Sequence, residues 1–173
     1  MFNKIVEKIK LRKLGCVAYA RDMGVCIGER CNFVSLPDFG SEPYLIEIGD
    51  HTEICSDVTF ITHDGATWVF RDNPKYKDVI RYGKIKIGNN CFIGKGTTIL
   101  PNVTIGDNTI IGASSLVTKD IPSGEVWGGV PAKKISTTEL FAEKCLLETP
   151  QYDFENYKKD KQRELLKILS QKD

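Results

Sequence analysis

Aliphatic residues recur at every sixth position along the second half of the chain. The series comprises Ile87, Ile93, Ile99, Ile105, Ile111 and Val117. Glycine follows the aliphatic residue at Gly88, Gly94, Gly106 and Gly112. Four positions after the aliphatic residue stands a compact side chain, as in Cys91, Thr97, Val103, Thr109 and Ser115. An earlier block repeats the rule at Ile27, Ile48 and Ile54. The pattern therefore indicates one repeat that is interrupted and then resumed.

A period of six matches neither the 3.6-residue period of an amphipathic helix nor the strict alternation of a strand. It is typical of a short strand followed by a turn. Gly, Asn, Asp and Pro fill the positions between the aliphatic residues, as at 88–90 and 106–108, and they supply the backbone angles of corners. Three such sides close a coil of 18 residues, and stacked coils bury their aliphatic ladders. A β-sandwich would not keep this phase, so the sequence predicts an all-β solenoid of hexapeptide repeats. The spacing does not fix its handedness.

Two interruptions break the phase. Ile27 and Ile48 are 21 residues apart, three more than one coil, so we expect a small bulge near Ser35 to Pro43. A longer insertion occupies about residues 64–84 and is rich in polar and aromatic residues. Long excursions from a rigid scaffold often carry function, although a plain surface insertion is the alternative.

The two ends of the chain differ from the repeat, and we expect three segments: a helical capping segment at 1–24, the repeat domain at 25–135 and a helical tail at 136–173. The first 14 residues carry a net charge of +4 and suit a short amphipathic helix that caps the domain or touches a membrane surface. In the tail, a capping box at Ser136 predicts a helix to about Leu147. A second helix is predicted from about Phe154 to Leu169. Its expected packing stripe consists of Leu165, Leu166 and Leu169.

The composition is that of an ordinary globular protein: 173 residues, 41% hydrophobic and 27% charged, with a formal net charge of +1. That charge gives no overall footprint for nucleic acid. No apolar run approaches the ~20 residues of a membrane span, and no secretion signal opens the chain, so we expect a cytoplasmic protein. The six cysteines include no C-x-x-C pair, which favours reduced, packed thiols.

Two strings after the repeat point to a known family. They are Val-Thr-Lys-Asp-Ile-Pro at 117–122 and Gly-Gly-Val-Pro-Ala-Lys at 128–133. Together with the repeat and the insertion, they resemble the hexapeptide-repeat acyltransferases over about residues 25–135. The strongest resemblance is to the galactoside, maltose, xenobiotic and capsular-polysaccharide O-acetyltransferases. It implies a left-handed parallel β-helix, acetyl-CoA as co-substrate, and a homotrimer with active sites between subunits.

His63 stands where the coil ends and the insertion begins. The resemblance implies that a histidine at this place is the catalytic base, a role that needs a pKa near neutrality. An ordinary loop histidine is the alternative. Asp64 either orients His63 or begins the loop. His51 is interpreted as structural or solvent-exposed.

The resemblance also implies a coenzyme site. Its residues are Lys95, Gly112, Ala113, Thr118, Lys119, Pro131, Ala132 and Lys133. Ala113 leaves room for the pantetheine arm, Lys119 and Lys133 meet phosphates as point charges, and Lys95 would use its backbone. Acceptor contacts are expected from Asp64, Trp68, Arg71 and Tyr82. Trp68 and Trp127 suit either the edge of a site or core packing.

The sequence thus predicts an acetyl-CoA-dependent O-acetyltransferase that acts on a hydroxyl of a sugar or polysaccharide precursor, with no metal. One alternative is an N-acetyltransferase that acts on an amino sugar nucleotide. Another is a non-catalytic scaffold. A zinc enzyme of the γ-carbonic anhydrase kind needs three histidine ligands, and this chain has two histidines.

Overall fold

The computed structural model describes residues 9–170. It divides into two compact units, the first ending at Thr138 and the second beginning at Glu139.

Three sheets make up the first unit. Sheet A contains β1 (Cys26–Ile27), β3 (Ile46–Ile48), β6 (Ile85–Ile87) and β9 (Thr104–Ile105). Sheet B contains β2 (Asn32–Phe33), β4 (Glu53–Ile54), β7 (Phe92–Ile93), β10 (Ile110–Ile111), β12 (Glu125–Gly128) and β13 (Lys133–Thr137). Sheet C contains β5 (Thr59–Phe60), β8 (Thr98–Ile99) and β11 (Leu116–Val117).

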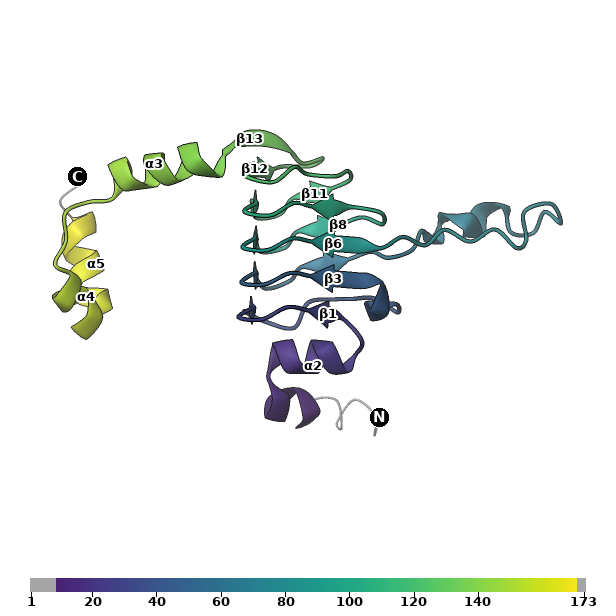
Figure 1. Ribbon diagram of the computed structural model, residues 1–173, viewed down its shortest axis with the longest axis horizontal. Coiled ribbons are helices and arrows are strands. Elements are labelled where there is room, and N and C mark those ends of the chain that lie inside the picture. Colours follow the sequence, from purple (N-terminus) through teal and green to yellow (C-terminus); the bar gives the residue numbers. More distant parts are fainter. Residues whose placement is uncertain (1–8, 171–173) are drawn as a thin grey trace. The chain divides into compact units, whose positions relative to one another are not determined.

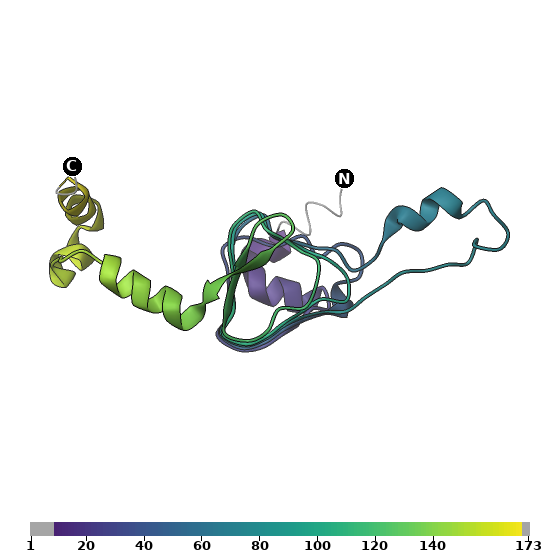
Figure 2. The same cartoon turned by 90° about the horizontal axis from the view of Figure 1, so that it is seen from above.

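From β3 to β11 the chain visits the sheets in the order A, B, C and then begins again, so each of these circuits adds one strand to each sheet (Figure 1). We name the three turns between them corner AB, corner BC and corner CA. Every strand pair is parallel except β12 with β13. Seen from above, the successive circuits lie over one another in a three-sided outline (Figure 2). The pairing of Phe92 with Ile110 and of Thr98 with Leu116 gives the predicted 18-residue offset.

The aliphatic residue of each repeat points inward, and from Ile87 to Val117 none is more than 4% exposed. The compact residues four positions later are also buried, and many of them are hydrogen-bond donors. Thr52 Oγ1 donates to the Gly88 carbonyl at 3.0 Å, and Cys91 Sγ donates to the Gly106 carbonyl at 3.1 Å. These side chains therefore link successive coils, because each donates a hydrogen bond to a backbone carbonyl of the neighbouring coil.

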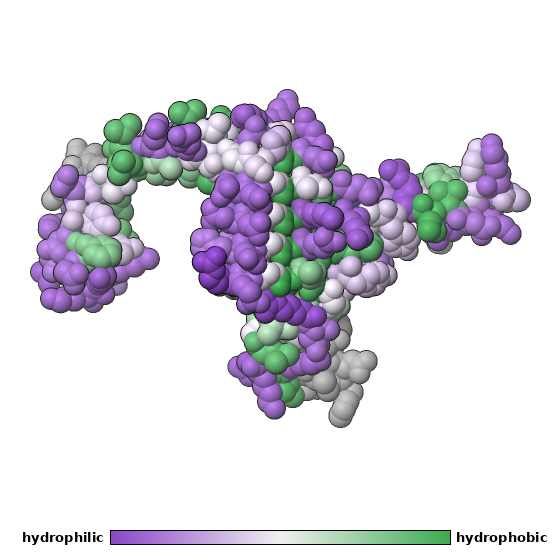
Figure 3. All heavy atoms as spheres, in the orientation of Figure 1, coloured by the Kyte–Doolittle hydropathy of each residue, from purple (hydrophilic) through white to green (hydrophobic). Residues whose placement is uncertain are grey.

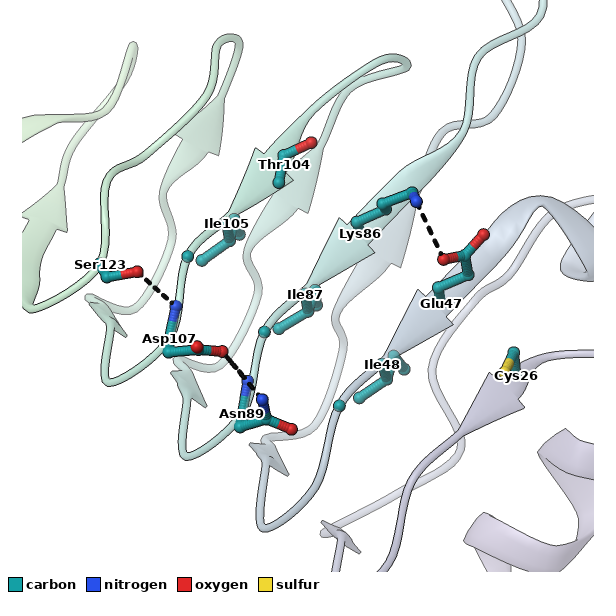
Figure 4. A pocket seen from close by; sticks show the side chains of 13 residues that line it. Cys26, Glu47, Ile48, Lys86, Ile87, Asn89, Thr104, Ile105, Asp107 and Ser123 are labelled. Atoms are coloured by element: carbon teal, nitrogen blue, oxygen red, sulfur yellow. Dashed lines mark hydrogen bonds and ion pairs between the residues drawn. The ribbon is translucent and has the colours of Figure 1, made fainter.

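Corner AB is held by a ladder of side chains that cap backbone N–H groups in the coil before. Asn89 Oδ1 accepts from Asp50 N–H at 2.8 Å, and Asp107 Oδ1 accepts from Asn89 N–H at 2.6 Å (Figure 4). His51 belongs to this corner: it has a φ of 52° and its Nδ1 lies 2.8 Å from Asn90 Oδ1. These contacts agree with the structural interpretation of His51.

The first interruption is not only a surface bulge, because it also contributes to the core of the coil. It places Phe39 inside the coil, where the ring stacks on Phe60 at a centroid distance of 5.3 Å. A short 3-10 helix, η1 (Pro43–Leu45), then leads into β3. The second interruption projects from the coil (Figure 1) and contains a 3-10 helix, η2 (Gly65–Phe70).

The predicted N-terminal helix lies partly outside the described residues. Within them, residues 9–14 are helical and α2 (Cys16–Asp22) contacts β1 and β2. Ala20 is fully buried beneath the first coil. None of the helices within residues 9–170 is long and apolar enough to cross a membrane.

The second unit contains α3 (Thr138–Glu148) except for its first residue, together with α4 (Phe154–Lys159) and α5 (Lys161–Leu169). The prediction of one helix from Phe154 to Leu169 is wrong. The helix breaks at Asp160, which has a φ of −147° and caps α5 by accepting from Arg163 N–H at 3.0 Å. The predicted packing stripe, Leu165, Leu166 and Leu169, is exposed within the chain, and its packing against a neighbouring subunit stays a prediction. The buried residues of α5 are Glu164 and Ile168, because they face α4 across the short turn.

Candidate active site

His63 lies where the long insertion leaves the coil and returns to it. Gly83 N–H donates to the Thr62 carbonyl at 2.8 Å, and His63 pairs with Tyr82 in an antiparallel bridge. The insertion therefore begins and ends as a short two-stranded ladder anchored on corner CA. The His63 side chain is 43% exposed, so its backbone is held while its imidazole stays accessible.

A carboxylate from the first interruption orients this imidazole. Glu42 Oε2 lies 2.8 Å from His63 Nδ1 and accepts from Thr62 Oγ1 at 2.7 Å. An ionised carboxylate can only accept, so Nδ1 carries the proton and Nε2 is left as the basic nitrogen. The Thr62 hydroxyl, then Ser41, then His63 lower the pKa of Glu42 below its ordinary 4.5, although burial opposes them. The carboxylate is therefore charged at neutral pH.

Sequence reasoning missed Glu42. The available signal was the three-residue excess between Ile27 and Ile48, which marks an interruption one coil before His63. Asp64, the residue considered as an orienter, has other contacts. Its Oδ1 accepts from Ala66 N–H at 2.9 Å and its Oδ2 lies 3.1 Å from Arg81 Nη1. Asp64 thus begins the loop by capping η2, and it fixes Arg81.

Two cavities meet at His63. One has a volume of about 740 Å³ and runs from His63 along Leu100 to Thr118. The other has a volume of about 240 Å³ and lies within the insertion, against Trp68 and Arg71. His63, Asp64, Gly65, Ile80, Arg81 and Tyr82 line both cavities. The imidazole is therefore reachable from two compartments, one along the coil and one in the insertion.

The predicted acceptor residues come together around the smaller cavity, which Asp64, Trp68, Arg71 and Tyr82 all line. The Tyr82 ring lies 5.6 Å from the His63 ring, and Trp68 is 79% exposed. Arg81, which the sequence analysis did not select, also lines this cavity. A basic residue two positions before the loop rejoins the coil was the signal for it.

The predicted coenzyme residues lie at two different corners of the coil, one at each end of the strands of sheet C. Corner CA carries Thr118 and Lys119. Corner BC, the segment after β12 and the start of β13 carry Lys95, Gly112, Ala113, Pro131, Ala132 and Lys133. Thr118 lines the larger cavity with His63, and the other seven do not. One chain therefore does not bring all eight to the imidazole.

Two of the predicted lysines already have partners within the chain. Lys119 Nζ lies 5.3 Å from the ring centroid of Trp127, and Lys95 Nζ lies 3.6 Å from Asp57 Oδ2. Trp127 pairs with Ile111 and is buried, so it packs into the core at the last coil.

A further cavity of about 440 Å³ lies on sheet A beside corner AB (Figure 4). Ile48, Ile87 and Ile105 line it. A narrow apolar stripe runs along the stacked coils between hydrophilic residues (Figure 3). The cavity contains no predicted site residue. Within residues 9–170, no group of three or more His, Cys, Asp or Glu side chains is arranged to hold a metal ion.

Comparison with known proteins agrees with this architecture. The family model described as bacterial transferase hexapeptide (six repeats) matches residues 84–119. Protein CapG of Staphylococcus aureus is 49% identical over 128 residues, which cover 73% of each chain. The galactoside O-acetyltransferase of Escherichia coli (strain K12) is 39% identical over 99 residues, 54% of this chain and 45% of the relative. The chain belongs to the hexapeptide-repeat acyltransferase family, and it is an acyltransferase.

A solved structure gives the same fold. The hexapeptide-repeat-containing acetyltransferase of Vibrio cholerae superposes with a TM-score of 0.55 at 22% identity, covering 70% of this chain and 78% of the other. At this identity the likeness concerns the fold alone.

Proposed function

We propose that the chain is an O-acetyltransferase that moves an acetyl group from acetyl-CoA to a hydroxyl of a sugar or polysaccharide precursor. The observation that carries the proposal is an imidazole oriented by Glu42 at the meeting point of two cavities. Transfer between two substrates needs such an arrangement, because both must reach one base at the same time. The names of the relatives, among them a galactoside O-acetyltransferase, support the acetyl donor and the sugar hydroxyl.

His63 acts as a general base in this proposal. Its Nε2 accepts the proton of the acceptor hydroxyl while the hydroxyl oxygen attacks the thioester carbonyl. The new C–O bond forms, the C–S bond breaks, and the proton passes from His63 to the departing sulfur. Glu42 holds Nδ1–H throughout and stabilises the imidazolium that forms between the two transfers. No covalent intermediate with the protein is required.

We further infer a homotrimer that completes the coenzyme site between subunits. The outward positions of sheet C are Thr59, Thr98 and Leu116, which carry no charge. Sheet A presents Glu47 and Lys86 at the equivalent positions. If sheets C of three copies face a common axis, corner CA of one copy lies beside corner BC of the next. That arrangement brings His63 and Thr118 of one copy close to the predicted coenzyme residues at corner BC of the next copy, among them Ala113.

The remaining expectations form part of the same proposal. The three stacked sheets are a left-handed parallel β-helix, as the family resemblance implies. Residues 25–135 are the catalytic domain, residues 9–24 of the predicted capping segment cap it, and residues 136–170 belong to the predicted tail; the rest of both segments lies outside the described residues.

The test is acetyl transfer from acetyl-CoA to a panel of mono- and oligosaccharides, with wild type, His63→Ala and His51→Asn. We expect turnover of His63→Ala to fall by ~10²–10⁴ with coenzyme affinity nearly kept. His51→Asn is the matched control, because asparagine also tolerates the positive φ of 52° at that position. Equal turnover of His63→Ala and wild type would remove the proposed base.

A further inference from the structure

We infer that the acceptor carries a negative charge: a sugar that bears a phosphate or a carboxylate, whose anionic group is bound by Arg71 with the help of Arg81. This inference rests on the proposed function, since it names the class of acceptor for the same site. It comes from the charges of the smaller cavity, whose walls contain two arginines and one carboxylate.

Arg71 is the cation of this cavity that lacks a countercharge within the described residues. Its Nη2 donates to Thr67 Oγ1 at 3.0 Å, and Thr67 is buried at 3% exposure. The guanidinium is thus tethered at one nitrogen to a fixed hydroxyl. Among residues 9–170, Arg71 takes part in no ion pair. An arginine has five N–H donors, so most of its donors remain available to a ligand.

Arg81 contributes in a different way. Its Nη1 lies 3.1 Å from Asp64 Oδ2, and Asp64 is itself fixed by Ala66 N–H. The charges of Arg81 and Asp64 therefore compensate each other. Of the charged side chains that line the cavity, Arg71 is the one left without an ion-pair partner among the described residues, since the Glu42 carboxylate bonds His63 and does not line the cavity. A neutral sugar would leave the charge of Arg71 unmatched when the ligand excludes water.

The other walls suit the uncharged part of such a ligand. Trp68 and Tyr82 supply aromatic faces against which the apolar side of a sugar ring packs, and His63 supplies the base for one hydroxyl. Guanidinium groups bind phosphates and carboxylates through paired N–H donors. The volume of about 240 Å³ is below the ~300–1,000 Å³ of sites that enclose drug-sized ligands. The cavity therefore matches one sugar residue with its charged substituent.

The experiment measures binding, so that it does not depend on catalysis. Glucose 1-phosphate, glucuronate and methyl glucoside are titrated by calorimetry into the full chain saturated with coenzyme A, which occupies the phosphate-binding groups of the donor site. The proteins are wild type, Arg71→Gln and Lys77→Gln. Lys77 is the charge-matched control, since it lies on the same insertion and lines neither cavity at His63.

We expect at least one of the two anions to bind wild type on the order of 10- to 100-fold more tightly than methyl glucoside. Arg71→Gln should lose this preference and Lys77→Gln should keep it. If glucose 1-phosphate binds more tightly than glucuronate, the anionic group of the acceptor is a phosphate; the reverse order indicates a carboxylate. Equal binding of all three sugars, binding of none, or an anion preference that survives in Arg71→Gln would each overturn the inference.

Failure of the proposed function gives a different result. In that case His63→Ala leaves transfer unchanged, while the preference for anions and its dependence on Arg71 are untouched. The opposite result is also distinguishable. If the protein prefers the neutral sugar while His63→Ala strongly lowers the transfer rate, the proposed transferase function holds and the inferred negative charge of the acceptor is wrong.

Discussion

The Nδ1 atom of His63 lies 2.8 Å from Oε2 of Glu42, a residue 21 positions earlier in the chain and in a different interruption of the repeat. Asp38 and Thr59 pair across the same offset of 21 residues, so the stacking of the first coil on the second brings Glu42 and His63 to the same corner. The contact between Glu42 and His63 fixes which ring nitrogen carries the proton. It therefore links the first interruption, which has no apparent chemistry of its own, to the reactivity of the second.

Replacing Glu42 by Gln tests this link. We expect turnover to fall by about 10-fold or more, because the amide lacks the charge that stabilises the imidazolium. The KM for acetyl-CoA should change little, since Glu42 lines neither cavity at His63. Steady-state kinetics of Glu42→Gln and of Glu53→Gln, an exchange on sheet B, provide the comparison. Full turnover in Glu42→Gln would mean that the contact serves stability alone.

The same carboxylate predicts a pH dependence of stability. The Thr62 hydroxyl is the largest of the groups that hold the pKa of Glu42 in the folded state below its ordinary 4.5. A carboxyl whose pKa is depressed by folding stabilises the fold fully above its unfolded pKa and loses this contribution as the pH falls through the folded pKa. The difference in melting temperature between wild type and Glu42→Gln should therefore shrink as the pH falls below 4.5. A difference that grows below pH 4.5 would show the opposite sign.

Much of the fold could be predicted because the six-residue spacing of the aliphatic residues is visible in the sequence. The inward aliphatic residues from Ile87 to Val117 follow from their spacing alone, since every side of the coil uses the same rule. The interruptions follow no repeated rule. Phe39 enters the core and Glu42 reaches His63 only through the path of the chain between them, and no periodicity specifies that path.

The candidate site divides in the same way. His63 is predictable from its place at the root of the insertion, and Arg71 from its place within it. For Glu42 and Arg81 the sequence offers only indirect signals, because their importance depends on contacts with residues distant in sequence or on the closing of the loop. The separation of Thr118 from Ala113 follows from the predicted three-sided path, because Ala113 follows one side of the coil and Thr118 follows the next.

A glycine substitution tests the stacking of the coils. A Cβ built on Gly88 would lie 2.8 Å from the backbone nitrogen of Asp107 in the next coil, so Gly88→Ala should force the coils apart. We expect a loss of about 1–3 kcal/mol in the free energy of unfolding, measured by urea titration. Gly65→Ala is the matched control, because a Cβ at that position would meet nothing within 4 Å beyond its own chain neighbours. Similar losses in both variants would mean that close stacking at corner AB is not what requires glycine.

Complementation tests whether two copies build one site. His63→Ala removes the base at corner CA, and Ala113→Trp fills corner BC where the coenzyme is proposed to lie. Each variant should be inactive alone. When the two are co-expressed, a cyclic trimer places an intact His63 of one copy beside an intact Ala113 of the next at about a quarter of its interfaces. Acetyl transfer should therefore return to a corresponding fraction of the wild-type rate. A site made within one chain gives no recovery, since every chain in the mixture then carries one defective half.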